Sequence, residues 1–200
     1  TSLANYWIHN GMINIDGEKM SKSLGNVRWA KDLIEKVGGP VVRWALIGTH
    51  YRAPLDLSEK TLEDAAKEIE KIRKPMQQAV LMLALNGAAI KEDEKAAEYW
   101  NEFMAAMEED LNTPNAISAL QKTVKALNAA LRQKEMDTAL VGGLAAAINN
   151  MLYVLGVQVE LIEPEAQDLE DWRSWKACVK EKDFENADKY RAKLMEKGLI

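Results

Sequence analysis

The spacing of apolar residues along the chain changes from an alternating to a helical pattern. In the first fifteen residues apolar and polar positions alternate, which predicts short strands at residues 6–8 and 12–15. Asn10-Gly11 is expected to separate the two strands, and Asp16-Gly17 has the composition of a tight turn. The start of the chain therefore predicts a small β element.

After this turn the pattern predicts helices over most of the chain. Apolar residues recur three or four positions apart, and Ser, Thr, Asn or Asp precede most of these repeats while Gly or Pro often ends them. Asn26 has the position of an N-cap for the first helix. The predicted helices span residues 27–37, 40–50, 58–85, 93–110, 113–131, 137–155, 169–181 and 184–197.

Together these elements predict a mainly α protein with three parts. Residues 1–57 form a small α/β piece, and residues 58–156 form an antiparallel bundle, because four long helices with short connections pack side by side. The acidic segment at 157–170, which contains Pro164, is predicted to be a linker. Residues 171–200 are predicted to form a helical hairpin.

The composition agrees with a helical, globular protein. Hydrophobic residues make up 48% of the chain and aromatic residues only 6%, a balance that favours helices over a β-sandwich or barrel. No apolar run approaches the roughly 20 residues needed to span a bilayer, and no signal-peptide pattern is present. Cys178 is the single cysteine, so no internal disulfide is possible. We therefore expect a reducing, cytoplasmic compartment and no membrane.

The net charge of −5 is unevenly distributed along the chain. Residues 1–75 carry a net +2, residues 76–170 a net −9 and residues 171–200 a net +2. A polyanion such as a nucleic acid would be tolerated at the two ends and repelled by the middle. We interpret the acidic middle as a solvated face of the helix bundle.

One segment has the composition of a polyphosphate-binding loop: Lys19-Met20-Ser21-Lys22-Ser23, between a predicted strand and a predicted helix. Lysine ammonium groups act as mobile point charges, and serine hydroxyls and free backbone N–H groups donate to phosphate oxygens. The following helix would add positive potential, and Gly17 and Gly25 would let the loop move. Composition alone equally describes a solvated turn. The literal string, however, arises by chance in only about one in 10,000 chains of this length.

This string is the signature loop of class I aminoacyl-tRNA synthetases, and the residues around it resemble the cysteinyl-tRNA synthetases in particular. The likeness covers essentially the whole chain, and implies a C-terminal part of such an enzyme that begins just before the loop, inside the catalytic domain. The segments that carry the resemblance are Tyr6–Gly11, Lys19–Asn26, Thr49–Arg52, Asp110–Pro114 and Lys182–Ile200.

The resemblance implies ATP-dependent ligation of cysteine to tRNA(Cys) through cysteinyl-adenylate. Lys22 would then contact the ATP phosphates and stabilise the pyrophosphate leaving group, with assistance from Lys19. Met20, Ser21 and Ser23 would complete the ATP-binding loop. The partners implied are ATP, cysteine and tRNA(Cys), and the family is expected to be monomeric.

Two parts of the family pattern are missing from this sequence. The His-x-Gly-His nucleotide signature is absent, and so is the set of Cys, His and Glu ligands that holds the family's zinc. His9, His50 and Cys178 are the only histidines and cysteine, and a zinc site needs three or four converging ligands. No metal site is therefore predicted in this chain, and we expect the chain to be inactive without the rest of the enzyme.

The resemblance also implies that residues 1–57 include a stem-contact region, that the bundle is of a tRNA-binding type, and that residues 171–200 are part of an anticodon-binding module. Basic residues that could meet the tRNA backbone, or simply be solvated, are Arg43, Arg52, Lys71, Arg73 and Lys74. Those of the tail are Arg173, Lys176, Lys180, Lys182, Lys189, Arg191, Lys193 and Lys197.

The role of two tail tryptophans and the function as a whole each have alternatives. Trp172 and Trp175 either pack as the core of the hairpin or stack on unpaired bases. The first alternative function is a tRNA-binding helical module without catalysis. The second is a ligase that joins cysteine to an amino sugar on the same scaffold, against which the anticodon-like tail argues. Another synthetase specificity, such as methionine, also stays open.

Overall fold

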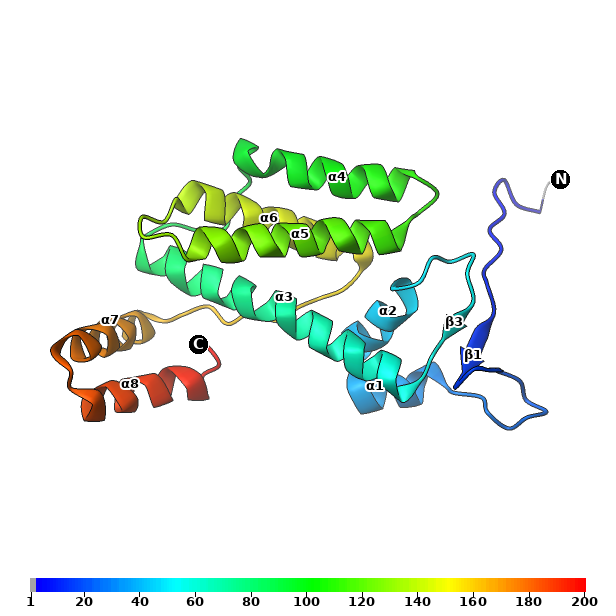
Figure 1. Ribbon diagram of the computed structural model, residues 1–200, viewed down its shortest axis with the longest axis horizontal. Helices are drawn as coiled ribbons and strands as arrows, with labels where there is room; N and C mark the ends of the chain where they lie inside the picture. The colour runs from blue at the N-terminus through cyan, green and yellow to red at the C-terminus, as the bar shows by residue number, and fades with distance from the viewer. Residues whose placement is uncertain (1–2) are drawn as a thin grey trace.

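The structure is a computed structural model that describes residues 3–200 (Figure 1). It is mainly helical, with a small sheet near the start of the chain, and this confirms the predicted fold class. In chain order the elements are β1 (Ile13–Ile15), β2 (Glu18–Lys19), α1 (Ala30–Val37), α2 (Gly39–Ile47), β3 (Leu55–Asp56), α3 (Glu59–Leu85), a 3₁₀ turn (Glu94–Ala96), α4 (Ala97–Glu108), α5 (Thr113–Leu131), α6 (Thr138–Leu155), α7 (Ala166–Glu181) and α8 (Phe184–Glu196).

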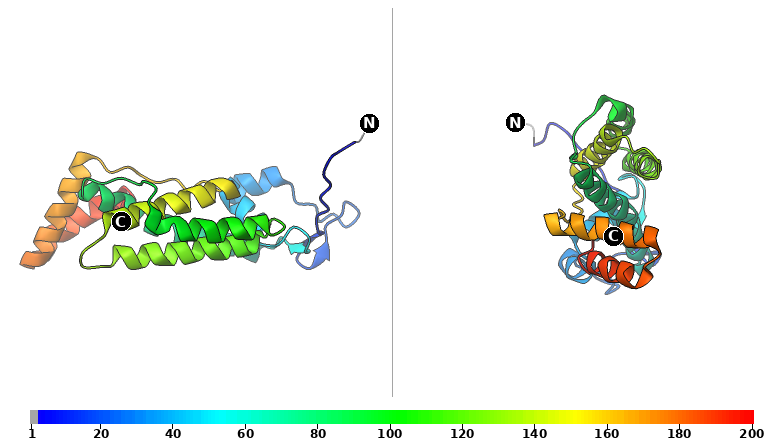
Figure 2. Two further views of the ribbon diagram at one scale, coloured as in Figure 1. Left: turned by 90° about the horizontal axis from the view of Figure 1, so that it is seen from above. Right: turned by 90° about the vertical axis from the view of Figure 1, so that its left-hand side faces the viewer.

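The elements are arranged in a row along an elongated molecule. The sheet and helices α1 and α2 occupy one end, the bundle of α3 to α6 lies in the middle, and the α7–α8 hairpin forms the other end (Figures 1 and 2). Helix α3 connects all three parts, since it packs against α2, α5, α6 and α7. Ser58 caps the start of this helix by accepting a hydrogen bond from the backbone N–H of Thr61.

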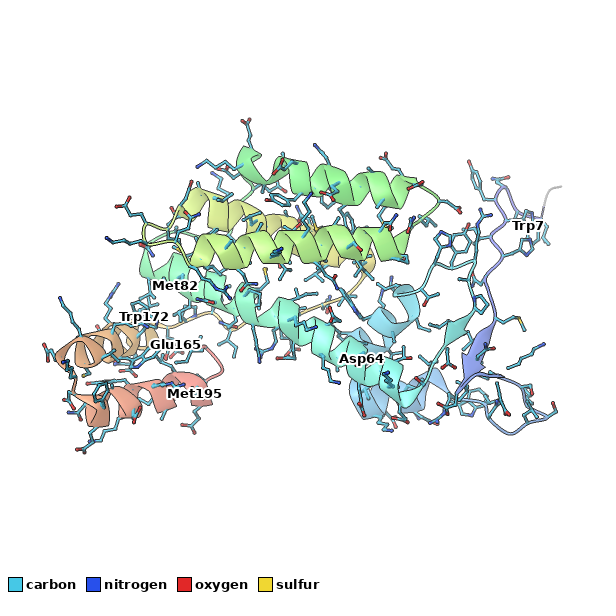
Figure 3. The ribbon with its side chains drawn as sticks, in the orientation of Figure 1. Trp7, Asp64, Met82, Glu165, Trp172 and Met195 are labelled. Carbon is cyan, nitrogen blue, oxygen red and sulfur yellow. The ribbon has the colours of Figure 1, made fainter. Side chains whose placement is uncertain are left out.

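The sheet has three strands in the order β2-β1-β3, with β1 antiparallel to β2 and parallel to β3. The predicted strand at residues 6–8 does not form, because both edges of β1 are already paired and these residues have no neighbouring strand in the described part of the chain. Tyr6 and Trp7 are 90% and 65% exposed. Figure 3 shows Trp7 on the N-terminal segment, away from the helices.

The main core fills the helix bundle. Its innermost side chains are among the largest apolar ones and are fully shielded from solvent, and burial of each stabilises the fold by about 1.5–3 kcal/mol. By length and composition α6 could cross a membrane, but 61% of it is buried inside the protein, as in a core helix. The central residues of the bundle core are Met76, Leu83, Phe103, Leu120, Leu127, Leu144, Ile148 and Met151.

The C-terminal hairpin differs from its prediction in two ways. Helix α7 begins at Ala166, three residues earlier than predicted, because Glu165 and Asp168 form a capping box there. Trp172 and Trp175 are half-buried and do not form the centre of the hairpin, which consists of Ala187, Leu194 and Leu199 with the carboxylates of Asp168 and Asp171. Trp172 is labelled in Figure 3, at the end of the molecule opposite to Trp7.

Candidate phosphate-binding site

The loop with the two lysines follows a tight hairpin at the end of the molecule farthest from α7 and α8 (Figure 1). Asp16 and Gly17 both have positive φ angles, 52° and 82°, the combination that closes a two-residue hairpin with the twist of its strands. The N–H of Gly17 donates to Oδ1 of Asp56 at 2.9 Å. The N–H of Met20 donates to the carbonyl of Ile13 at 3.1 Å. These bonds attach the start of the loop to β1 and β3.

Asn26 braces the loop and does not cap a helix, contrary to the prediction. Its Oδ1 accepts a hydrogen bond from the N–H of Ser21 at 2.8 Å, and its Nδ2 donates to the carbonyl of Lys19 at 3.2 Å. Helix α1 begins only at Ala30, with Trp29 as N-cap and no side-chain capping bond. The brace therefore ties both ends of the loop together, and the helix start is farther along the chain than predicted.

Inside this closed loop the chain makes a second turn. The N–H of Gly25 donates to the carbonyl of Lys22 at 3.2 Å, and Gly25 has a φ of 67° that favours glycine. The hydroxyls of Ser21 and Ser23 lie 3.2 Å apart, and the Ser21 hydroxyl also accepts from the N–H of Leu24. The serines thus shape the loop from within. Ser23 is exposed and Ser21 is half-buried, so Ser23 is the more accessible hydrogen-bond donor to an anion.

Lys19 and Lys22 are both exposed. Among the described residues no carboxylate lies within 4 Å of either ammonium group, whereas Arg28 and Lys36 nearby are both paired with Glu59. Two uncompensated cations on one braced loop can neutralise an anion with several oxygens. A hollow of about 420 Å³ beside the loop is lined by Gly25, Asn26, Arg28 and the acidic hairpin, not by these lysines.

The zinc implied by the resemblance has no donor set here. Within residues 3–200 no three side chains of the His, Cys, Asp or Glu type converge in a way that could hold a metal ion. His9 is exposed and His50 lies in the connection between α2 and β3, while Cys178 is in α7. The residues that the structure describes therefore do not form a donor set for zinc.

A second polar cluster, which sequence reasoning did not find, joins the α2–β3 connection to the bundle. Asp110 accepts hydrogen bonds from Tyr51 Oη at 2.7 Å and from Arg52, whose Nη2 lies 3.0 Å from Oδ1 and whose Nε lies 2.9 Å from Oδ2. His50 Nε2 lies 3.8 Å from Oδ2. The hydrogen bonds from Tyr51, then those from Arg52, lower the pKa of Asp110, and Asp110 in turn raises the pKa of Arg52.

Most of the basic residues considered for tRNA contact have intramolecular partners. Arg43 donates to the carbonyl of Leu155, and Lys71 and Arg73 pair with glutamates one turn earlier in α3. In the hairpin, Lys176 lies over the Trp175 ring at 4.0 Å from its centroid. Those without an ion pair among the described residues are Arg43, Lys74, Arg173, Lys176, Lys180, Lys182 and Arg191.

Two protein-family models match this chain, one over the part with the braced loop and one over part of the helix bundle. Residues 1–67 match the family described as tRNA synthetases class I (C) catalytic domain, and residues 102–160 match the DALR domain family. The first match contains the braced loop, and the second covers most of α4, α5 and α6. The chain is thus a class I aminoacyl-tRNA synthetase sequence.

Individual relatives specify the family further. The cysteine–tRNA ligase of Halalkalibacterium halodurans is 34% identical over 205 residues, which cover 99% of this chain and 44% of that protein. The corresponding enzymes of Mesoplasma florum and Oceanobacillus iheyensis are 32% and 35% identical, again over 44% of each relative. The chain belongs to the cysteinyl-tRNA synthetase family, and it spans less than half the length of these relatives.

Solved structures share the fold. One of them is a leucyl-tRNA synthetase from Agrobacterium radiobacter K84, crystallised as a ternary complex with tRNA and LeuAMS. The TM-score is 0.56, with 24% identity, over 80% of this chain and 24% of that chain. This likeness shows that a large part of the fold also occurs in that structure.

Proposed function

We propose that the protein containing this chain ligates cysteine to tRNA(Cys) in the cytoplasm, and that the braced loop is its ATP-phosphate site. The single observation that carries the assignment is the loop itself. Two exposed ammonium groups, Lys19 and Lys22, have no carboxylate partner within residues 3–200 and lie on a segment whose backbone is closed by Asn26. The family matches supply the reaction to which this loop belongs.

The first step of that reaction is formation of cysteinyl-adenylate. A carboxylate oxygen of cysteine attacks the α-phosphorus of ATP, the bond from that phosphorus to the bridging oxygen breaks, and pyrophosphate leaves with the electron pair. Negative charge grows on the leaving group as the bond breaks, so cations placed there act mainly in the transition state. We assign Lys22 to the leaving pyrophosphate, and Lys19 to an assisting contact on the same phosphates.

The other residues of the loop would maintain its shape and contact the nucleotide. Ser21 and Ser23 are placed to hydrogen-bond phosphate oxygens, and Met20 lies half-buried against the core beside β1. The second step transfers the cysteinyl group from AMP to the tRNA. No residue described here is assigned to that transfer, and the tRNA partner is proposed from the family alone.

The test compares Lys22→Ala with Lys31→Ala in the full-length protein that contains this chain. Lys31 is also an exposed lysine, but it lies in α1 and pairs with Glu35. Cysteine-dependent exchange of pyrophosphate into ATP measures adenylation. We expect Lys22→Ala to lower kcat by about 100-fold or more, with a smaller change in KM for ATP, as for loss of a group that stabilises a transition state.

Two further measurements complete this test: pyrophosphate exchange by the control variant and pyrophosphate exchange by the chain alone. Lys31→Ala should exchange pyrophosphate at the wild-type rate. Equal losses in kcat and in ATP affinity for Lys22→Ala, or no loss at all, would contradict the assignment. We also expect the chain alone to give no exchange. Exchange by the chain alone would show that it contains a whole active site.

A further inference from the structure

Two segments far apart in the sequence meet in the folded chain. Both resemble the family, and the proposed chemistry gives neither of them a role. The first is Thr49–Arg52, between α2 and β3, and the second begins at Asp110, between α4 and α5. Figure 1 shows the α4–α5 connection at the end of the bundle that faces the sheet. Three proton-donating side chains of the first segment surround the Asp110 carboxylate of the second, namely His50, Tyr51 and Arg52.

The backbone around Asp110 adopts a conformation that few residues tolerate. Asp110 has a φ of 55° and Leu111 a φ of 53°, both in the left-handed region. Leucine is rare in this region, and such conformations persist where the surrounding structure imposes them. The side chain of Leu111 is 47% exposed, so burial of that side chain does not explain the turn. What the turn does accomplish is to bring the Asp110 carboxylate to the α2–β3 segment.

The same segment is bonded on its other side to the strand that leads to the phosphate loop. The carbonyl of Tyr51 accepts a hydrogen bond from the N–H of Gly11 at 2.6 Å. Gly11 lies so close to this segment that a Cβ atom there would be 2.1 Å from the carbonyl oxygen of Ala53. Strand β1 starts two residues later and continues through its hairpin into the loop. Tyr51 therefore contacts the bundle with its side chain and the start of β1 with its backbone.

Other contacts between the α/β piece and the bundle involve α1, α2 and β3. Arg43 of α2 donates to the carbonyl of Leu155, and α2 packs along α3. Arg28 and Lys36 pair with Glu59 of α3. Thr61 of α3 donates to the carbonyl of Asp56 in β3, so this contact reaches β1 only through the neighbouring strand. Among the described hydrogen bonds and ion pairs, those of Asp110 join the α4–α5 end of the bundle to the segment that holds β1.

We propose that Asp110 is a positioning residue, which orients β1 and the loop with Lys19 and Lys22 relative to the helix bundle by holding Tyr51 and Arg52. The proposal rests on the proposed function, because the loop must act on ATP for its orientation to matter for the reaction. Asp110 touches neither nucleotide nor amino acid. Its effect passes through Tyr51 and the Gly11 hydrogen bond to the strand.

The variant that tests this is Asp110→Asn. Asparagine tolerates the left-handed conformation as well as aspartate does, so the turn is retained while the charge that pairs with Arg52 is removed. The matched control is Asp137→Asn, at the opposite end of the bundle. Asp137 is also an exposed carboxylate with a cationic partner, Lys95, and asparagine replaces it well as the N-cap of α6.

Amide hydrogen exchange of this chain is the first measurement. We expect Asp110→Asn to speed exchange of Gly11 and of the β1 and loop amides by about two- to fivefold, the range that corresponds to loss of an exposed ion pair. The amides of α3, α5 and α6 should be unchanged. The same acceleration in Asp137→Asn, or no acceleration in Asp110→Asn, would overturn the proposal.

Pyrophosphate exchange by the full-length protein is the second measurement. Asp110→Asn should lower kcat for adenylation and leave KM for ATP unchanged, because the loop keeps its cations but is less often in the reactive orientation. If Lys22→Ala loses adenylation and Asp110→Asn does not, the positioning role is wrong and the proposed function stands. If Lys22→Ala keeps full activity, the proposed function itself fails.

Discussion

The side-chain amide of Gln77 pairs with the backbone of Ile162 in both directions. Its Nε2 donates to the carbonyl of Ile162, its Oε1 accepts from the N–H of Ile162, and both distances are 2.8 Å. Gln77 belongs to α3 and is only 3% exposed. The Gln77 amide thus pairs with both backbone hydrogen-bonding groups of Ile162, as a neighbouring strand would. It thereby holds the segment between α6 and α7 against the bundle.

We expect Gln77→Leu to lower the free energy of unfolding by about 1–3 kcal/mol, because the backbone groups of Ile162 lose their partners on a partly buried surface. Exchange of the Ile162 amide should rise in parallel. Gln78→Leu is the matched control, since Gln78 is the adjacent residue of α3 and is exposed. Equal stability of the two variants in urea denaturation would show that the pairing does not hold the segment.

Gly11→Ala tests the close approach of the residues just before β1 to the α2–β3 segment. The added Cβ would lie 2.1 Å from the Ala53 carbonyl oxygen and 2.5 Å from its carbon, so the backbone has to separate. We expect a loss of about 1–3 kcal/mol, as for insertion of a methyl group into a packed site. Thermal denaturation with exchange of the β1 amides would measure it.

The control for this variant is Gly39→Ala. A Cβ at Gly39 meets no atom within 4 Å, and its φ is not in the left-handed region. Its stability should stay unchanged or rise by up to about 1 kcal/mol, since alanine restricts the unfolded chain. A destabilisation of the same size in both variants would mean that the contact at Gly11 is not tight.

The third prediction concerns the acid stability of the C-terminal hairpin. Burial would raise the pKa of Asp168, but the hydrogen bonds from Lys197 and from the backbone of Glu165 outweigh it and lower this pKa. A carboxyl group with a lowered pKa in the folded state stabilises that state above its unfolded value of about 3.9. This contribution is lost as the pH falls through the lower, folded pKa.

We therefore expect the hairpin to keep constant stability from neutral pH to about pH 4 and to lose it below that value. Tryptophan fluorescence contains a signal from this transition, because two of the six tryptophans, Trp172 and Trp175, lie on α7. Asp168→Asn should flatten the acid transition, and Asp188→Asn, at an exposed position of α8, should keep the wild-type profile. If Asp168→Asn showed the same acid transition as the wild type, Asp168 would not be the cause of that transition.

The sequence pattern located most elements but not their ends. Each predicted helix is present within a few residues, since the repeat of apolar positions follows from the geometry of a helix and needs no information from elsewhere in the chain. The ends depend on competition for hydrogen bonds. Asn26 is a residue type that often caps the start of a helix, but its side-chain amide instead forms hydrogen bonds with the backbone of Ser21 and Lys19. Both uses suit an asparagine equally, and only the folded loop distinguishes them.

By itself, the sequence determined the helical class of this protein, the position of the loop with Lys19 and Lys22, and the family to which that loop belongs. Local periodicity and a rare five-residue string are readable without coordinates. Only the tertiary structure decided which distant groups meet. Asp110 and Tyr51 are 59 positions apart, and Gln77 and Ile162 are 85 apart. Such pairs arise from the packing of whole helices, and no local pattern encodes their partners.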